Sequence, residues 1–197
     1  MTGIHTWSLL VTSHDLLRTE VAAIPADGRQ LPTPAAEWNV IQVVQHSAGD
    51  QLAYASALTG RPGPDQDPFA PSPTWNGDPA ELLDTALKAS TDAFATLDPS
   101  RETVPVPLPP FEVTAATAAG AAALDAAIHA WDIAVATGRP SPLTDELARR
   151  LAPVAQELVE PLRGFAYAPA IDAAPGAGDA VALLNYLGRD AEWRPTT

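Results

Sequence analysis

Hydrophobic residues recur every three or four positions along most of the chain, which is the spacing of helices that bury one face. The first such segment covers residues 6–26, and Asp27-Gly28 then offers a stop. Asn39 can cap a second helix that ends at Gly60. The same spacing predicts further helices over residues 79–97, 114–137, 144–162 and 179–187.

The segments between these helices are rich in proline. Residues 61–78 hold five prolines and three aspartates without a periodic pattern, and a long loop of this kind often covers a site. In residues 104–113 proline alternates with valine and leucine, which favours an extended crossover over a paired strand. Pro153 is expected to kink or split the helix over 144–162. No repeat or linker divides the chain, so we expect one all-α domain spanning residues 1–197.

Two of the predicted helices are almost free of charge. Over residues 114–137 the only charged side chains are Asp125 and Asp132, and over residues 39–60 the only one is Asp50. A helix on the surface rarely has such a composition, so we expect both helices in the core. Burying an unpaired carboxylate costs roughly several kcal/mol, so these groups are expected to meet a cation, a partner or a water-filled cavity.

A metal site follows from the positions of three side chains. Asp125 and His129 lie four residues apart and share one helix face, and His46 can complete three ligands from a facing helix. Two imidazoles and a carboxylate suit zinc, with nickel or ferrous iron as alternatives, and leave positions open to water or a thiolate. Asp50 and Asp132 are expected to orient the imidazoles without binding the metal themselves. A purely structural bundle with a hydrogen-bonded polar core stays open as the alternative.

Other candidate residues have simpler interpretations. His14 shares a helix face with Trp7 and Val21, so a position in the core or at its boundary is expected. The tryptophans are expected to pack against other residues rather than to form a cage around a ligand; these are Trp38, Trp75, Trp131 and Trp193.

The overall composition limits the function classes. There are 24 acidic residues against 11 basic ones, a net charge of -13, which argues against binding to nucleic acid or to an anionic membrane surface. The start of the chain lacks a basic segment followed by an apolar one, so we expect a cytoplasmic protein. The chain has no cysteine, so any thiol chemistry must use an external thiol.

Three motifs resemble a known family. Glu37-Trp38-Asn39-Val40 followed by Val43-Val44-Gln45-His46 looks like its first motif, and residues 128–134, which contain His129, look like its second. Residues 183–193, Leu-Leu-Asn-Tyr-Leu-Gly-Arg-Asp-Ala-Glu-Trp, look like its C-terminal signature. The chain is thus similar to the actinobacterial metal-binding branch of the DinB/YfiT-like superfamily, which is related to the N-terminal domain of mycothiol-dependent maleylpyruvate isomerase.

The resemblance implies a fold, a site and a chemistry. It implies a DinB-like four-helix bundle, here with extra short helices and long proline-rich loops, that binds a divalent metal through His46, Asp125 and His129. Asp125 stands where many relatives have glutamate. The implied function is a mycothiol-dependent or similar thiol-dependent enzyme, a transferase or an isomerase acting on a small electrophile, with Arg189 binding a carboxylate of the thiol or substrate or forming a structural salt bridge.

Two alternatives to this function stay open. The same ion could serve as a Lewis acid in secondary metabolism without a thiol, or the bundle could bind a metal or small ligand without catalysis. The expected partners are therefore a small-molecule substrate and a thiol, with no nucleic acid and no membrane, and a homodimer is compatible with these features.

Overall fold

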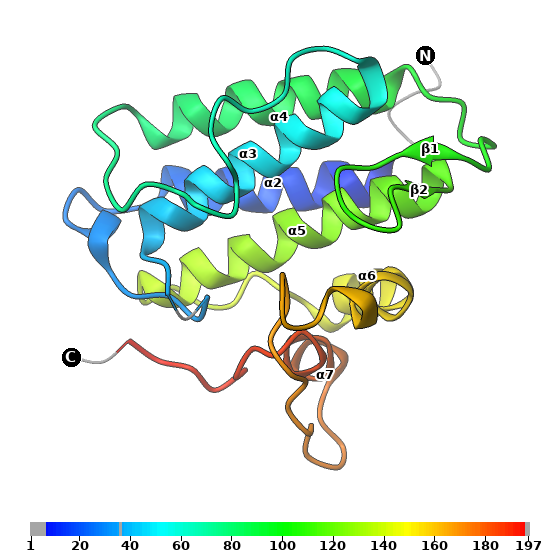
Figure 1. Ribbon diagram of the computed structural model, residues 1–197. Coiled ribbons are helices and arrows are strands. Elements are labelled where there is room, and N and C mark those ends of the chain that lie inside the picture. The colour runs from blue at the N-terminus through cyan, green and yellow to red at the C-terminus, as the bar shows by residue number, and fades with distance from the viewer. Residues whose placement is uncertain (1–6, 36, 196–197) are drawn as a thin grey trace.

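Helices form nearly all of the regular structure in the computed structural model, which describes residues 7–35 and 37–195 (Figure 1). Two short 3-10 turns and one minimal hairpin accompany the α-helices. The elements in chain order are α2 (Ser8–Ala22), η1 (Gly28–Gln30), α3 (Val40–Thr59), α4 (Pro79–Ala95), β1 (Val104–Pro105), β2 (Glu112–Val113), α5 (Ala115–Ala136), α6 (Asp145–Leu158), η2 (Glu160–Leu162) and α7 (Asp179–Tyr186).

The first four of these α-helices form a four-helix bundle. α2 packs against α4 and α5, and α3 packs against the same two helices. α6 then packs against α5, and α7 packs against α6, so the C-terminal part of the chain forms a second layer beneath α5 in Figure 1. The predicted all-α bundle with short extra helices and long proline-rich loops is confirmed.

Local sequence signals determine where the bundle helices begin and end. Asn39 accepts a hydrogen bond from the backbone N–H of Gln42, whose side chain in turn accepts from the N–H of Asn39, a capping box that starts α3. Gly60 ends α3 with a φ of 70°, a left-handed conformation that glycine adopts without strain. Thr114 caps α5 in a similar way. Asn39 and Gly60 are the two helix ends that the sequence predicted, whereas Thr114 was expected inside the helix that it caps.

α5 is the central helix of the protein. It is buried on nearly all sides because α2, α3 and α6 pack around it, and its residues belong to both hydrophobic clusters of the core. By length and composition α5 could cross a membrane, but 94% of its most apolar window is buried against the rest of the chain. That burial is what a core helix of a globular fold shows.

Some helix bounds differ from the prediction. The first helix ends at Ala22 rather than near residue 26, because Pro25 disfavours the helical conformation of the residue before it; its expected start at residue 6 lies outside the described residues. α6 continues through Pro153 to Leu158 and is followed by the 3-10 turn η2. Pro153 is exposed, so the carbonyl that loses its helical hydrogen bond there can bond to water.

The prediction that residues 104–113 form an unpaired crossover was wrong. Val104 pairs with Val113 and Pro105 with Glu112 in an antiparallel hairpin, and the N–H of Val106 donates to the carbonyl of Phe111 at 2.9 Å. Prolines lack the N–H that a ladder needs, so the pairing is only two residues long. Alternate valines are buried while the prolines face outward, and this alternation holds the hairpin on the bundle.

Candidate metal centre and its cavity

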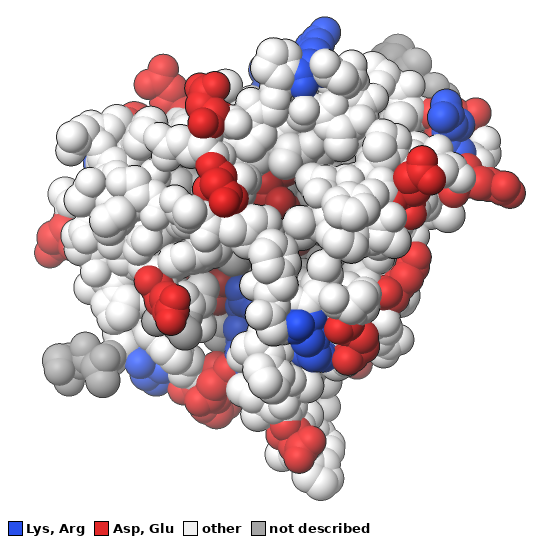
Figure 2. Space-filling view, viewed as in Figure 1, with Lys and Arg blue, Asp and Glu red and all other residues white. Residues whose placement is uncertain are grey.

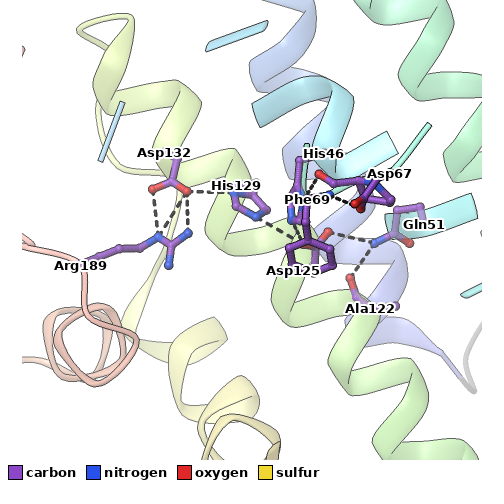
Figure 3. Close-up of polar contacts among 10 residues, drawn as sticks. His46, Gln51, Asp67, Phe69, Ala122, Asp125, His129, Asp132 and Arg189 are labelled. Atoms are coloured by element: carbon purple, nitrogen blue, oxygen red, sulfur yellow. Dashed lines mark hydrogen bonds and ion pairs between the residues drawn. The ribbon is translucent and has the colours of Figure 1, made fainter. Parts of the chain in front are cut away.

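The three predicted ligands meet between α3 and α5. Nε2 of His46 lies 3.5 Å from Oδ1 of Asp125, and Nε2 of His129 lies 3.4 Å from the same oxygen. One potential ligand atom from each of the three lies within 4.8 Å of the other two. His129 follows Asp125 by one helical turn, and His46 faces both from the neighbouring helix, as Figure 3 shows.

Each imidazole is oriented by a hydrogen bond at its other nitrogen. Nδ1 of His46 lies 2.9 Å from the carbonyl oxygen of Pro68, and a carbonyl only accepts, so the proton of a neutral His46 is on Nδ1. Nδ1 of His129 lies 2.9 Å from Oδ2 of Asp132. Both Nε2 atoms are thereby directed at Asp125, and in its neutral form each imidazole has its lone pair on that side, which is the arrangement of imidazoles that bind a metal.

This arrangement concentrates negative charge that requires a cation. Burial alone would raise the pKa of Asp125, but the imidazoles of His129 and His46 hold it far below its usual range. Burial alone would lower the pKa of His129, and the carboxylates of Asp125 and Asp132 raise it well above its usual value instead. A proton on His129 therefore occupies the position of the cation when no metal ion is bound.

The donor set fits a divalent transition metal. Ligands about 2.1 Å from a tetrahedral zinc ion lie about 3.4 Å from one another, and the two N–O distances to Asp125 are close to that value. Two neutral imidazoles and one carboxylate also suit nickel or ferrous iron. With three protein donors, a bound ion would keep at least one position for a ligand from the cavity.

Asp132 and Arg189 continue the row of polar side chains behind His129. The Asp132 side chain is fully buried and accepts hydrogen bonds from Nε and Nη2 of Arg189, at 3.0 and 2.9 Å (Figure 3). Burial alone would raise the pKa of Asp132, but Arg189 and His129 lower it, so the carboxylate stays ionised. Asp132 thus orients His129, as the sequence predicted, and Arg189 forms the structural salt bridge that was the alternative to a ligand contact.

Asp50 does not take the role that was expected of it. It was predicted to orient an imidazole, but the carbonyl of Pro68 holds His46 and Asp132 holds His129. Asp50 instead lines the cavity described below, with 7% of its surface exposed. The carbonyl of Pro68 takes the role that was expected of Asp50, because the 61–78 loop, which contains Pro68, folds back over α3.

Two contributors to the site were missed in the sequence. Pro68 acts through its backbone carbonyl, which no side-chain pattern can indicate. Its close approach depends on Gly49, since a Cβ there would lie 3.0 Å from the Pro68 ring. The other is Gln51, a fully buried residue whose Nε2 donates to the carbonyl of Ala122 at 3.0 Å and lies 3.4 Å from Oδ2 of Asp125. Its position in a helix nearly free of charged residues was the available signal.

Gln51 connects the site to the far side of the bundle. Because its Nε2 faces a carbonyl, its Oε1 must be the acceptor for the hydroxyl of Ser90 and for Nε2 of His14, both at 2.9 Å. Burial lowers the pKa of His14 to about 4, so this histidine is neutral. His14 was expected in the core or at its boundary, and it lies in the core.

A cavity of about 720 Å³ opens beside the candidate ligands. α3 and α5 form its floor, and the 61–78 loop, the hairpin loop and residues 164–168 and 187–189 form its walls. Trp38 lies against His46 with 4.6 Å between ring centroids and lines the cavity, so it is not only a packing residue as expected. Figure 2 shows this face hollowed near its centre, with more acidic than basic side chains around the hollow.

Comparisons with known proteins agree with this architecture. The family model described as mycothiol maleylpyruvate isomerase N-terminal domain matches residues 10–134, which include His46, Asp125 and His129 but not Arg189. Uncharacterized proteins from two strains of Mycobacterium tuberculosis are each 28% identical over 151 residues, covering 76% of this chain and 76% of their own length. No solved structure matches the chain significantly.

Proposed function

The chain belongs to the mycothiol maleylpyruvate isomerase N-terminal domain family, a DinB-like group, and we propose that it is a divalent-metal protein that uses a mycothiol-type thiol to transform a small electrophile. The reaction class would be a thiol transfer or a thiol-assisted isomerisation. Zinc is the ion that the donor set favours.

One observation supports this proposal above all others. Two imidazoles, each held at Nδ1, direct Nε2 at the same oxygen of Asp125, and this group borders a cavity large enough for a substrate. A polar core that served only stability would satisfy these nitrogens with one another or with nearby backbone. Here both Nε2 atoms are directed at one carboxylate oxygen of Asp125, at the border of the cavity.

The roles of the residues follow from their positions. His46, Asp125 and His129 would hold the ion, and Asp132 and Pro68 would keep the imidazoles in the binding tautomer. A divalent ion there would lower the pKa of a thiol bound to it, so that the nucleophilic thiolate forms near neutral pH. The thiol must come from solution, because the chain contains no cysteine.

Arg189 would contribute to anion binding at the cavity wall. Its Nε and Nη2 are directed at Asp132, while the side chain also lines the cavity. A guanidinium carries five N–H donors, so those not used by Asp132 can donate to a carboxylate or hydroxyl of the thiol. Asp132 fixes the plane of the guanidinium and therefore the direction of those donors.

Metal analysis of the purified protein tests the first half of the proposal. We expect close to one ion per chain in wild type and in His14→Gln, which alters a buried histidine outside the site, and a loss of most of the metal in His129→Ala. Metal at equal levels in all three proteins, or in none of them, would contradict a site built on His129.

Cobalt substitution tests the second half. A thiolate that coordinates cobalt(II) gives a strong near-ultraviolet charge-transfer band, so titration with mycothiol should produce that band in wild type and not in His129→Ala. If metal binds and no thiol changes the cobalt spectrum, the thiol-dependent function is wrong. A Lewis-acid enzyme without thiol or a non-catalytic binding protein would then be the better description.

A further inference from the structure

Asp50 is a buried carboxylate that lines the cavity. Only 7% of its surface is exposed, and among residues 7–35 and 37–195 no hydrogen bond or ion pair to its side chain is present. Leaving a buried carboxylate unpaired is costly, so such a group normally has a partner. The partner is expected to come from the cavity.

The position of Asp50 relative to the candidate ligands sets where that partner would be. His46, Asp50 and Tyr54 occupy successive turns of α3 and all line the cavity. Four residues of helix advance about 6 Å, so a molecule whose reactive group lies at the metal centre and which extends along α3 passes Asp50 about one turn further on. Asp50 is not part of the group of ligand atoms that lie within 4.8 Å of one another.

The charges around the cavity indicate what kind of group Asp50 would meet. Its lining contains the acidic residues Glu37, Asp50 and Asp125 and one basic residue, Arg189, which already pairs with Asp132. A divalent ion would neutralise the charge at Asp125, whereas Asp50 would remain without a counter-charge. Burial and the nearby charge of Asp125 both raise the pKa of Asp50, and a cation beside it would relieve both effects.

The cavity walls are suited to the same kind of ligand. Aromatic faces attract cations, and apolar side chains bury the remainder of a small molecule. Phe69 and Phe165 lie 5.0 Å apart between ring centroids at one wall, and Phe165 is 65% exposed, which places an aromatic pair at the opening. The aromatic residues of the lining are Trp38, Tyr54, Phe69, Phe165 and Tyr167.

We propose that the substrate of this protein carries a cationic nitrogen, an amine or amidine, which forms an ion pair with Asp50 one helical turn from the metal centre. This proposal rests on the proposed function, since it places the reactive end of the substrate at the ion. Asp50 is then a specificity-determining residue. It selects the substrate by charge, and it is distinct from the three side chains that would hold the metal.

Two probes of matched shape and different charge test the proposal on the zinc-loaded protein: benzamidine, a cation, and benzamide, which is neutral. Ligand-observed NMR gives the affinity of each. We expect wild type to bind benzamidine at least about tenfold more tightly than benzamide. In Asp50→Asn the preference for benzamidine should disappear, because the substitution removes the charge and retains the shape.

A control and a second measurement keep the result interpretable. Asp172→Asn removes the same charge from an exposed position and should leave the affinities for benzamidine and benzamide unchanged. Zinc affinity of Asp50→Asn should stay within about threefold of wild type, since Asp50 lies outside the ligand group. Circular dichroism of each variant verifies that the fold is intact.

The outcomes separate this proposal from the proposed function. Equal binding of benzamidine and benzamide by wild type, or an unchanged benzamidine preference in Asp50→Asn, would overturn the role of Asp50 while leaving the metal site intact. Loss of zinc from Asp50→Asn would overturn it as well, because Asp50 would then be a metal ligand. If wild type fails to bind zinc, the proposed function fails first, and the substrate assignment that rests on it fails too.

Discussion

The side-chain amide of Gln51 donates to the carboxylate of Asp125, with 3.4 Å between Nε2 and Oδ2, and so leaves Oδ1 as the oxygen that faces both imidazoles (Figure 3). The amide cannot rotate freely, because the carbonyl of Ala122 and the hydroxyl of Ser90 hold its two ends. Gln51 therefore determines how the acidic ligand is presented, while its own oxygen is occupied by Ser90 and His14.

Replacing Gln51 by leucine should weaken zinc binding. The substitution keeps the volume of the side chain but frees Asp125 to rotate, and loss of such supporting hydrogen bonds typically costs about 10- to 100-fold in metal affinity. Competition against a chromogenic chelator measures the change. Ser90→Ala, which removes only the bond at the far end of the amide, should change the affinity by less than about threefold. Equal affinities of Gln51→Leu and wild type would rule out this role.

Asp132 and Arg189 should show strong energetic coupling. Removing one member of a buried pair leaves the other charge uncompensated, so Asp132→Asn and Arg189→Gln should each lower the free energy of unfolding by about 3 to 5 kcal/mol. The double variant should lose clearly less than the sum of the two, because it leaves no unpaired charge. Urea denaturation of the metal-free proteins gives all four values. Additive losses would show that the two side chains do not interact.

His14 should make the protein sensitive to mild acid. Its pKa is lowered from 6.5 to about 4 in the fold, so the unfolded chain binds a proton first as the pH falls, and stability is lost between about pH 6.5 and pH 4. The loss attributable to His14 amounts to about 3 kcal/mol at most. His14→Gln, which cannot be protonated, should lose less stability over this range.

The comparison with His14→Gln isolates this one group. The raised pKa of His129 acts in the opposite sense, with stability lost as the pH rises, and it contributes equally to both proteins. Urea denaturation at a series of pH values, in the presence of a chelator, gives the two curves. Parallel curves would mean that His14 is protonated as easily in the folded protein as in the unfolded chain.

Asp50→Asn should stabilise the metal-free protein at neutral pH. The pKa of Asp50 is raised by burial and by Asp125, so the unfolded chain releases this proton more readily, and stability is lost as the pH rises above about 4. Removing the charge should add roughly 1 to 3 kcal/mol at pH 7 and little near pH 3. Thermal denaturation at the two pH values measures the difference. A destabilised variant at pH 7 would mean that Asp50 has a stabilising partner in the folded chain.

Local sequence signals were sufficient for most of the helices and for placing Asp125 and His129 on one helix face. Helix spacing, Asn39 and Gly60 at the ends of α3, and the near absence of charge from α3 and α5 are local signals, and each reports on its own segment. Asp125 and His129 share a face because they lie one turn apart on a single helix. For these features chain neighbours determine the outcome, so the order of residues is enough.

Contacts between distant segments were decided only by the tertiary structure. The carbonyl of Pro68 reached His46 from 22 residues away, and Gln51 reached Asp125 from 74 residues away. Arg189 forms an ion pair with Asp132, and Asp50 lines a cavity instead of contacting an imidazole. Such pairings depend on how loops and helices pack in three dimensions. A helical period states which side of a helix a residue occupies, but not which distant side chain or backbone group will meet it there.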